Sequence, residues 1–490
     1  MTADTLATAA EPGARRRLLA RVKGDPAYVG LLTLVAATAY AIIGLVKLAT
    51  YRATTFDLVV VDQAVRNYAN FRPPYIPVVA AWHGRPLDYL QIVDHFSPIY
   101  ALLAPFYWVH DGPGSLIVAQ ALLFAAAIPF LWLFTRRVLG TAPAYLVAVA
   151  YALSWPVAQA IAFDAHEVMF VPVLTAIMIE RYTAGRLLPA YLAMFGLLLV
   201  KEDMGLMVIG FGLYLLLTGD RFRGLCCAVI GVAGVVLTRG AIIPLLGGDS
   251  GDFWAYNHLG PDIPSAIVAM LKDPLETLLL PFSAEAKVDT LFLLAWPTLM
   301  LCLLSPLSVI ALPHVLERML SDRDMWWQAD FQYNAFTVII LFCAGVDGLA
   351  RLLRRLKRAD DRTLKIAWAT AVAAVALTLV PRFALDQLYH PDFYKGDEGK
   401  IAAASAAAAQ VPDGALVEAV NSLGPALTSR ATVLLWTAQP HDAPWIVADT
   451  ARWEYPFGSA DDQRAQVDAL LTMGYTKVFE RDGYVVLNRR

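Results

Sequence analysis

Charged residues are scarce in this chain of 490 residues: Asp, Glu, Lys and Arg make up 17%, against about 25% in an average soluble domain. Hydrophobic residues, in contrast, make up 58%. A soluble protein of this length would divide into roughly three domains, each with a charged surface, and the charges are too few for that. The composition therefore excludes a soluble enzyme and predicts an α-helical polytopic membrane protein.

Cysteine is also rare, and neither sign of charge dominates. The four cysteines lie inside apolar runs and lack the spacing of metal ligands, so they are interpreted as small buried apolar residues. They indicate neither a disulfide framework nor a cysteine-based zinc site. The net charge of −3 gives no indication of a nucleic-acid partner.

Apolar runs recur along the chain and predict about eleven membrane segments within a domain over residues 28–381. The first, 28–49, follows a basic tail over residues 1–27 and is long enough to span a bilayer core of about 30 Å. Ala39-Tyr40-Ala41 loosely fits a signal-peptide cleavage site, but the run continues through it. The other runs cover about 115–134, 141–160, 168–180, 187–200, 204–218, 225–246, 288–303, 305–317, 332–350 and 366–381.

Basic residues follow the even-numbered segments, which predicts the orientation. With the basic tail inside, all of them fall on the cytoplasmic side, as the positive-inside rule requires. We therefore expect a multi-pass protein of the cytoplasmic (inner) membrane, with the N-terminus cytoplasmic and the C-terminal part outside. These residues are Arg136 and Arg137, Arg181 and Arg186, Arg221 and Arg223, and Arg351, Arg354, Arg355, Lys357 and Arg358.

The orientation depends on how residues 288–317 fold. Read as one helix, they would invert everything downstream and place the last basic cluster outside. Pro297, Pro306 and Pro313 interrupt the run, and proline disrupts a helix interior. We therefore expect a hairpin of two short segments that turns near Ser305-Pro306.

The predicted outer face carries acidic and histidine side chains among Trp, Phe and Tyr. Lys201-Glu202-Asp203 lies between the runs 187–200 and 204–218, and at 1.5 Å per residue neither run crosses the bilayer core. These three charges are therefore expected to be recessed, where ionisable residues are functional candidates by default. The alternative is a local ion pair of Lys201 with Glu202 or Asp203.

Two aspartates open the long first outer loop, residues 50–114. Asp57 directly follows the first segment and has no local partner, so it is the better candidate for a general base. Asp62 faces Arg66 at i,i+4, and an ordinary ion pair is its alternative. In a helix the two aspartates would lie about 140° apart, so they would not form a pair on one face.

The remaining site candidates are predicted to contact substrate. Asp94 and His95 could hydrogen-bond a sugar, cap the helix that starts at Pro98 or, least favoured, bind a metal. Arg85 and Lys201 are the candidates for holding a phosphate. No metal ligand is assigned and no cofactor is certain, although a divalent metal is possible. The predicted substrate-binding residues are Asp94, His95, Arg85, His166, Glu167, Lys201, Glu202, Asp203, Trp326 and Gln328.

Residues 382–490 change character and predict a small extracytoplasmic α/β domain. Their sequence shows no nucleophile motif, phosphate loop or metal cluster. Structural cover and recognition of an acceptor or carbohydrate both remain open as roles. Helices are expected at about 398–410 and 461–473, and strands at 415–417, 431–436, 445–449, 476–480 and 484–488.

Four motifs resemble domain-of-unknown-function family 2079, a family of prokaryotic membrane proteins. The likeness runs from about residue 30 to the tail, and the order and spacing of the motifs make it specific. One departure is Phe331-Gln332-Tyr333-Asn334, where that family often has a histidine, so any role of that histidine is in doubt here. The four motifs are Phe56-Asp57-Leu58 with Asp62-Gln63, Asp94-His95-Phe96-Ser97-Pro98, Phe163-Asp164 with His166-Glu167, and Lys201-Glu202-Asp203.

That family looks like part of the GT-C glycosyltransferase superfamily, which implies a function. Such enzymes transfer a sugar from a polyprenyl-phosphate carrier to an extracytoplasmic acceptor. By this resemblance Asp57 takes the position of the general base, Asp62 is the reserve, and Lys201 meets the lipid phosphate. The implied partners are membrane lipids and a lipid-linked sugar; the oligomeric state is not implied.

Two other functions remain open. A transporter or flippase of a lipid-linked or small polar substrate would place ionisable residues near the midplane in broken helices, often with an internal repeat. Here these residues gather on one face, and no clear repeat is found, which favours an extracytoplasmic enzyme. A scaffold without chemistry predicts that the polar cluster is dispensable.

Overall fold

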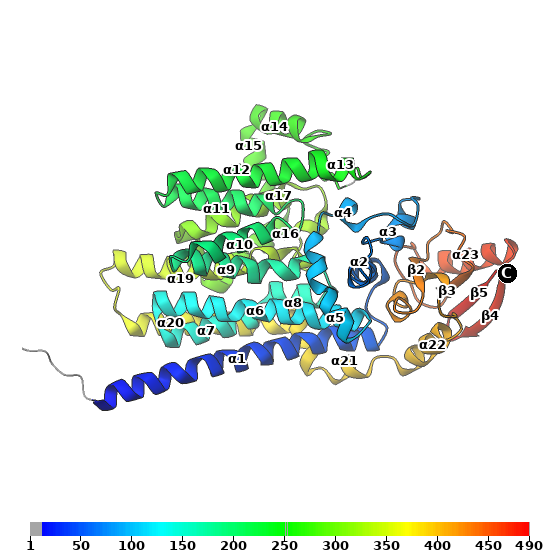
Figure 1. Cartoon of the computed structure of the whole chain (residues 1–490), viewed down its shortest axis with the longest axis horizontal. Helices are drawn as coiled ribbons and strands as arrows, with labels where there is room; N and C mark the ends of the chain where they lie inside the picture. Colours follow the sequence, from blue (N-terminus) through cyan, green and yellow to red (C-terminus); the bar gives the residue numbers. More distant parts are fainter. Residues whose placement is uncertain (1–11, 250, 252, 490) are drawn as a thin grey trace, which may run out of the picture.

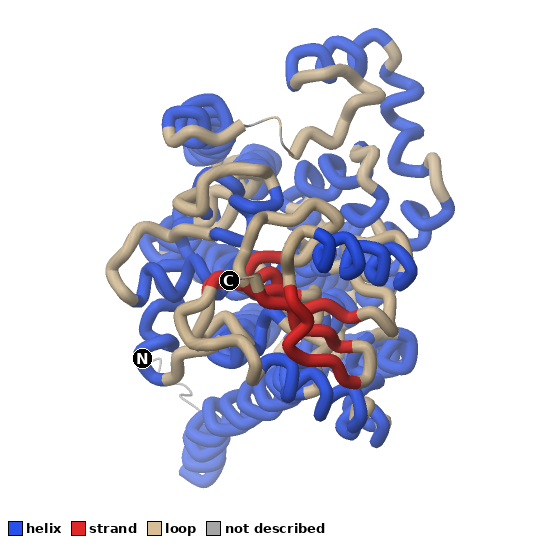
Figure 2. The backbone as a smooth tube through the Cα atoms, turned by 90° about the vertical axis from the view of Figure 1, so that its right-hand side faces the viewer, coloured by secondary structure: helices blue, strands red, loops and turns tan. Residues whose placement is uncertain are grey.

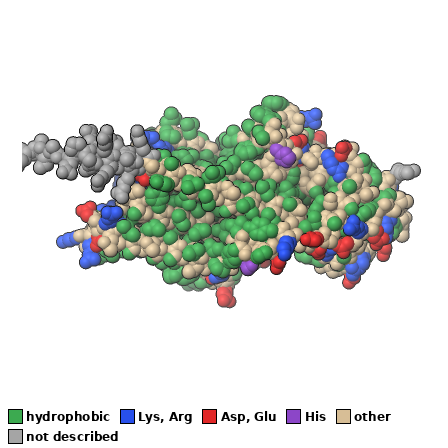
Figure 3. All heavy atoms as spheres, turned by 90° about the horizontal axis from the view of Figure 1, so that it is seen from below, with side chains coloured by type: hydrophobic (Ala, Val, Ile, Leu, Met, Phe, Trp, Pro, Cys, Tyr) green, Lys and Arg blue, Asp and Glu red, His purple; other side chains and the backbone are tan. Residues whose placement is uncertain are grey.

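Helices occupy one end of the elongated molecule and a small sheet occupies the other (Figure 1). The structure is a computed structural model that describes residues 12–249, 251 and 253–489. Residues 1–11 of the expected basic tail lie outside the described residues. Hydrophobic side chains cover the helical part, whereas charged side chains gather at the two ends (Figure 3). This distribution suits a molecule whose middle lies in a bilayer.

Five helical stretches of the described chain are long and apolar enough, by length and composition, to cross a membrane. Each coincides with an expected apolar run, and the chain is mostly helical. The total of eleven stays a prediction, because the other runs form shorter elements. The five are Gly24–Ala49, Pro113–Leu139, Thr141–Ala162, Arg221–Leu245 and Arg362–Arg382.

The helices of the membrane part are interrupted by the first outer loop, between α1 and α6, and by a second long connection, between α13 and α14. They are α1 (Pro12–Ala49), α6 (Pro113–Leu139), α7 (Thr141–Ala152), α8 (Trp155–Ala162), α9 (Val171–Thr183), α10 (Leu187–Leu197), α11 (Gly205–Leu217), α12 (Arg221–Leu237), α13 (Ile243–Leu245), α14 (Ile263–Lys272), α15 (Pro274–Leu279), α16 (Glu285–Ala295), α17 (Leu312–Leu320), α18 (Asp324–Trp327), α19 (Val338–Arg355) and α20 (Arg362–Leu379).

Helices α11 and α12 pack unusually closely because glycines line their contact. A Cβ atom at Gly212 would lie 2.6 Å from the backbone nitrogen of Ala228, and one at Gly231 would lie 2.5 Å from the carbonyl oxygen of Gly205. Small residues let membrane helices approach at backbone distance. The packing matters for the site, because Asp203 precedes α11 and Arg239 follows α12.

The segment 285–320 folds back on itself, as expected. Leu299 and Met300 have left-handed backbone angles, φ 55° and 62°, which end the helical path after α16. Lys287 Nζ, at the start of α16, donates to the carbonyl oxygen of Met319 at the end of α17, 2.7 Å away. The two ends therefore meet, so the chain reverses within this segment, with the helical path ending at Leu299-Met300 and not near Ser305-Pro306; two membrane segments here stay a prediction.

The C-terminal residues form a mixed five-stranded sheet with the order β2-β1-β3-β5-β4. The inner strand β1 pairs in parallel with β2 and β3, whereas β5 pairs antiparallel with β3 and β4. Figure 2 shows the sheet lying in front of the helices. All the expected strands and both expected helices are present. They are α22 (Glu398–Ala408), β1 (Leu416–Ala419), β2 (Thr432–Leu435), β3 (Trp445–Asp449), α23 (Ala460–Thr472), β4 (Thr476–Arg481) and β5 (Tyr484–Asn488), after a short α21 (Pro391–Lys395).

The first outer loop and the C-terminal domain share one hydrophobic core. Ile76 and Val78 of the loop are fully buried in the same cluster as Val433 and Leu435 of β2. Gln63 also donates to the carbonyl oxygen of Val433 at 2.8 Å. The loop is therefore a folded layer between the bilayer part and the sheet. Its helices are α2 (Val60–Ala69), α3 (Pro77–Trp82), α4 (Gln91–Asp94) and α5 (Ala104–Val109).

Candidate functional site

Asp57 lies in a single π-helical turn, Thr55–Val59, directly after α1. Its Oδ1 atom is 3.2 Å from His166 Nε2, and its Oδ2 atom accepts a hydrogen bond from Thr54 Oγ1 at 3.2 Å. The Asp57 side chain is 29% exposed and that of His166 is 14% exposed. The carboxylate is thus both oriented and reachable from solvent.

A second aspartate fixes the turn that carries Asp57. Asp164 is 4% exposed and accepts hydrogen bonds from the backbone nitrogen and the hydroxyl of Thr54, at 2.9 Å and 2.7 Å. Lys47, at the end of α1, is 3.4 Å from the other oxygen of this carboxylate. Asp164 belongs to the motif Phe163-Asp164, but sequence reasoning did not include it among the site residues. Its structural role is to hold Thr54 and, through it, Asp57.

The partnership with Asp57 changes the titration of His166. Burial lowers the pKa of His166, but the hydrogen bond and the charge of Asp57, together with the charges of Glu167 and Asp164, outweigh it, so the pKa is raised above its usual value. A histidine whose pKa is raised in the folded state stabilises the fold. This stabilisation is fully present below the pKa of the unfolded state, about 6.5, and is lost as the pH rises through the pKa of the folded state.

We expect Asp57→Asn to lower the pKa of His166, because the burial remains while the partner charge is gone. The measurement is an NMR titration of the histidine imidazoles in wild type and variant. His95 provides the internal control, because its raised pKa reflects burial opposed by the charge of Glu202, which the substitution leaves in place. An unchanged pKa of His166 in the variant would contradict the pairing.

Lys201 forms its ion pair with a residue far away in the sequence. Its Nζ atom is 3.0 Å from Glu167 Oε1, and both side chains are about nine-tenths buried. Tyr100 donates from its hydroxyl to the other oxygen of Glu167 at 3.2 Å. The alternative of a local pair with Glu202 or Asp203 is therefore wrong. Because Glu167 directly follows His166, this pair connects the Asp57 turn to the recessed charges.

Glu202 connects the recessed charges to the first outer loop. One carboxylate oxygen is 2.9 Å from His95 Nδ1, and the other accepts from the backbone nitrogen of Phe96 at 3.1 Å. Arg239 is 3.9 Å from the same carboxylate. Neighbouring Asp94 contacts His83 at 4.0 Å, so the two adjacent residues Asp94 and His95 have different partners.

A small cavity of about 20 Å³ lies at the centre of these charges. Five predicted site residues line it: His95, Lys201, Glu202, Asp203 and Trp326. Four ionisable residues that sequence reasoning missed line it as well. They lie inside the runs 225–246 and 305–317 or next to them, and an ionisable residue in an apolar run is the signal that could have found them. The four are Arg239, His314, Glu317 and Arg318.

An apolar groove of about 360 Å³ adjoins the cavity and shares Asp203, Arg239 and Glu317 with it. Helix α14, which the sequence reading left unassigned, forms one of its walls. The groove therefore has charges at one end and hydrocarbon along the rest. Its apolar lining includes Leu206, Val235, Trp254, Ile263, Ala266, Ile267, Met270, Leu316 and Leu320.

Asp62 lies apart from this cavity and is fully buried. It accepts hydrogen bonds from Arg66 at 3.1 Å, from the Tyr107 hydroxyl at 2.6 Å and from the Thr428 hydroxyl at 2.7 Å. The expected i,i+4 pair with Arg66 is present. These hydrogen bonds join the first loop to the C-terminal domain. Because the Asp62 carboxylate is buried and already accepts three of them, it does not suit the role of an alternative general base.

Six further predicted residues also lie outside the cavity lining: Asp57, Arg85, Asp94, His166, Glu167 and Gln328. Arg85 donates to the carbonyl oxygen of Gly247 at 3.1 Å and lies over the ring of Tyr89. Gln328 donates to Asp324 at 3.3 Å, and its own carbonyl oxygen accepts from Asn334 at 2.9 Å. These contacts are to other loop residues, and the phosphate role of Arg85 stays a prediction.

Three aromatic rings from distant segments meet next to Asp57. The ring centroids of Phe56 and Trp82 are 5.0 Å apart, and those of Trp82 and Tyr455 are 6.0 Å apart. Trp82 and Tyr455 are 37% and 41% exposed. Tyr455 belongs to the C-terminal domain, so this domain contributes directly to the surroundings of Asp57.

The fold and the site define a multi-pass helical membrane protein with a small α/β domain and a charged cavity that is lined by the first outer loop and by residues at the ends of the helices. The chain belongs to the family described as predicted membrane protein (DUF2079), whose profile matches residues 47–486. The resemblance found in the sequence is thereby confirmed. A search of curated proteins finds no match to the chain.

Several solved structures have a similar fold, although their sequence identity to this chain is low. ArnT from Cupriavidus metallidurans bound to undecaprenyl phosphate is 13% identical, with a TM-score of 0.50 over 94% of this chain and 98% of that one. The apo state of the same protein gives 14% identity and a TM-score of 0.49 over 95% and 98%. The archaeal oligosaccharyltransferase AglB from Archaeoglobus fulgidus is 12% identical, with a TM-score of 0.46 over 87% of this chain and 70% of that one. The first of these likenesses shows that the fold is ArnT-like.

Proposed function

We propose that this protein is a membrane glycosyltransferase that transfers a sugar from a polyprenyl-phosphate donor to an extracytoplasmic acceptor. The observation that carries the proposal is the apolar groove that ends in a charged cavity, because a lipid phosphate needs both surfaces side by side. The ArnT structure of similar fold was determined with undecaprenyl phosphate bound, which supports the same class of ligand here.

In this proposal the polyprenyl tail lies in the groove, and Arg239 and Lys201 face the phosphate. Asp57 accepts the proton of an acceptor hydroxyl, whose oxygen attacks the anomeric carbon of the sugar. The bond from that carbon to the phosphate oxygen breaks, and the polyprenyl phosphate leaves with the electron pair. His166 orients the Asp57 carboxylate, and the aromatic rings of Trp82 and Tyr455 lie on the acceptor side.

Binding of undecaprenyl phosphate to the purified full-length protein tests the donor site. Arg239→Gln is expected to weaken binding roughly 10–100-fold, as for a lost hydrogen bond to a charged group. Ala266→Trp, which fills the groove, is expected to weaken binding of undecaprenyl phosphate and undecaprenol alike, whereas Arg239→Gln affects only the phosphate. The matched control is Leu278→Trp on the exposed face of α15, where the side chain is 68% exposed. Unchanged binding in both groove variants would refute the site.

The proposed acceptor side requires the C-terminal domain to lie outside the cytoplasm. An alkaline-phosphatase fusion after Arg490 is expected to be active, because that reporter folds only outside the cytoplasm. A fusion within the basic cluster, after Arg355, should be inactive and serves as the control. An expressed but inactive C-terminal fusion would refute the orientation.

A further inference from the structure

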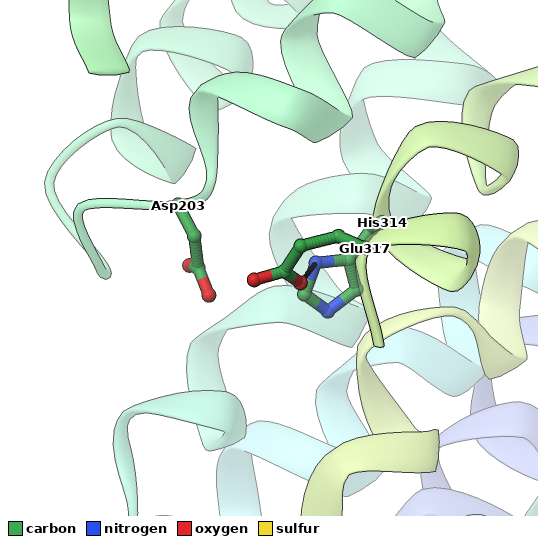
Figure 4. A group of neighbouring side chains, drawn as sticks. All are labelled: Asp203, His314 and Glu317. Carbon is green, nitrogen blue, oxygen red and sulfur yellow. Dashed lines mark ion pairs between the residues drawn. The ribbon is translucent and has the colours of Figure 1, made fainter. Parts of the chain in front are cut away.

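Asp203, His314 and Glu317 bring three potential metal ligands together at the junction of cavity and groove (Figure 4). One ligand atom from each lies within 4.8 Å of the other two. His314 and Glu317 are three residues apart on α17 and so share one face of that helix, while Asp203 approaches from the loop before α11. Two ligands of one ion at about 2.1 Å lie roughly 3.4–4.2 Å apart, so small side-chain rotations close the set.

The polar atoms of this cluster lack ordinary partners. His314 is 2% exposed, and neither of its ring nitrogens has a hydrogen-bond partner among the described residues. The Glu317 carboxylate lies 3.6 Å from Nδ1, which is beyond hydrogen-bond distance. Asp203 Oδ1 is likewise buried without a partner. Since an unsatisfied buried polar group costs about 1–3 kcal/mol, a missing partner is indicated.

The charges of the cluster point to a cation as that partner. Arg239, Arg318 and Lys201 line the same cavity, but none of the described Lys or Arg nitrogens lies within 4.0 Å of the Asp203 or Glu317 carboxylate. Arg318 instead donates to Asn334 at 3.2 Å. Two neighbouring carboxylates in a low-dielectric site repel each other unless one is protonated or a cation lies between them, and a bound cation also supplies the partner that the His314 ring lacks. The cavity volume of about 20 Å³ has room for one ion or water molecule.

We propose that Asp203, His314 and Glu317 bind one divalent transition-metal ion, Zn²⁺ or Mn²⁺. Imidazole favours Zn²⁺ over Mg²⁺ and Ca²⁺, and carboxylates suit Mn²⁺. A ligand set of one imidazole and two carboxylates therefore suits Zn²⁺ or Mn²⁺. Three protein ligands leave a coordination position open, as in catalytic metal sites. Two of the three residues also line the apolar groove, so the open position faces the place where an anionic lipid headgroup would lie. Metal binding by these three residues is independent of the proposed glycosyltransferase activity, and only the place of the lipid headgroup rests on the proposed function.

Metal binding to the purified full-length protein tests the proposal without any assay of activity. After removal of metal by a chelator, dialysis against Zn²⁺ or Mn²⁺ is expected to restore one ion per chain, measured by mass spectrometry of the metal content. Asp203→Asn, His314→Gln and Glu317→Gln should each weaken binding at least about 100-fold, since even the loss of a group that orients a ligand costs 10–100-fold. His390→Gln, at an exposed position, is the matched control.

Thermal unfolding keeps the test decisive where a variant is less stable. The bound ion should raise the melting temperature of wild type and of His390→Gln, because it binds the folded state. It should not raise that of the three ligand variants. An ordinary ion pair between His314 and Glu317 predicts no stoichiometric metal and no thermal shift in the wild type. That result, or equal binding by all variants, would overturn the proposal.

Discussion

Asp57→Asn is expected to abolish the proposed sugar transfer almost completely, with a loss of about 10²–10⁴-fold, the usual contribution of a general base, which is the role proposed for Asp57. The amide is nearly the same size as the carboxylate and still accepts the hydrogen bond from Thr54 Oγ1. It cannot take a proton from the acceptor hydroxyl, however. In cells that lack the protein, this variant should fail to restore the lipid-linked sugars or envelope glycans that are lost.

The control for Asp57→Asn is a second aspartate in the same loop. Asp111 is 58% exposed and pairs with Arg66 at the surface, so Asp111→Asn should restore the glycans fully. Equal amounts of both variants in the membrane exclude a trivial effect of expression. Full restoration by Asp57→Asn would remove the assignment of Asp57 as the base.

Asp62→Ala is expected to lower the free energy of unfolding by about 3 kcal/mol, the lower end of the range for a broken buried ion pair. The substitution leaves the Tyr107 and Thr428 hydroxyls without their acceptor. Arg66 keeps Asp111 as a partner, which limits the loss. Because Thr428 belongs to the C-terminal domain, the docking of this domain on the first loop should loosen first. Thermal unfolding and limited proteolysis in detergent measure both effects.

Asp413→Ala provides the matched comparison for Asp62→Ala. It removes the ion pair between Arg430 and Asp413, in which the aspartate side chain is 84% exposed. Exposed pairs contribute about 0–1 kcal/mol, so this variant should unfold like the wild type. If the two variants have the same stability, the buried network around Asp62 does not join the two units.

Much of the fold could be predicted from the sequence because its signals are local. Each apolar run became a helix or a group of short helical turns, since backbone groups in a bilayer must be satisfied within the segment. The strands around Val417, Val433 and Ile446 were found from short β-branched runs between turns. The shared core of the first loop and the sheet was not found, because its members, such as Ile76 and Val433, lie far apart in the chain.

The candidate site was found only in part, for the same reason. Asp57, His166 and Lys201 stood out because their motifs are local and mix charge with aromatic residues. Their pairing could not be predicted, since His95 and Glu202 are 107 residues apart and Asp57 and His166 are 109 apart. His314 and Glu317 were hidden inside a run that was assigned to the bilayer. An apolar run that is judged only by its length is assigned to the bilayer, and the ionisable residues within it are then overlooked.

The amino-acid sequence by itself determined that this protein resides in a membrane, because a chain with 17% charged residues cannot cover three soluble domains. It also determined which segments are helical and which motifs carry ionisable groups. Only the tertiary structure decided which of these groups meet: Asp57 with His166, Lys201 with Glu167, and Asp203 with His314 and Glu317. The physical reason is that composition and periodicity act along the chain, whereas an ion pair or a ligand set depends on distances in space, which helix packing and chain reversals set.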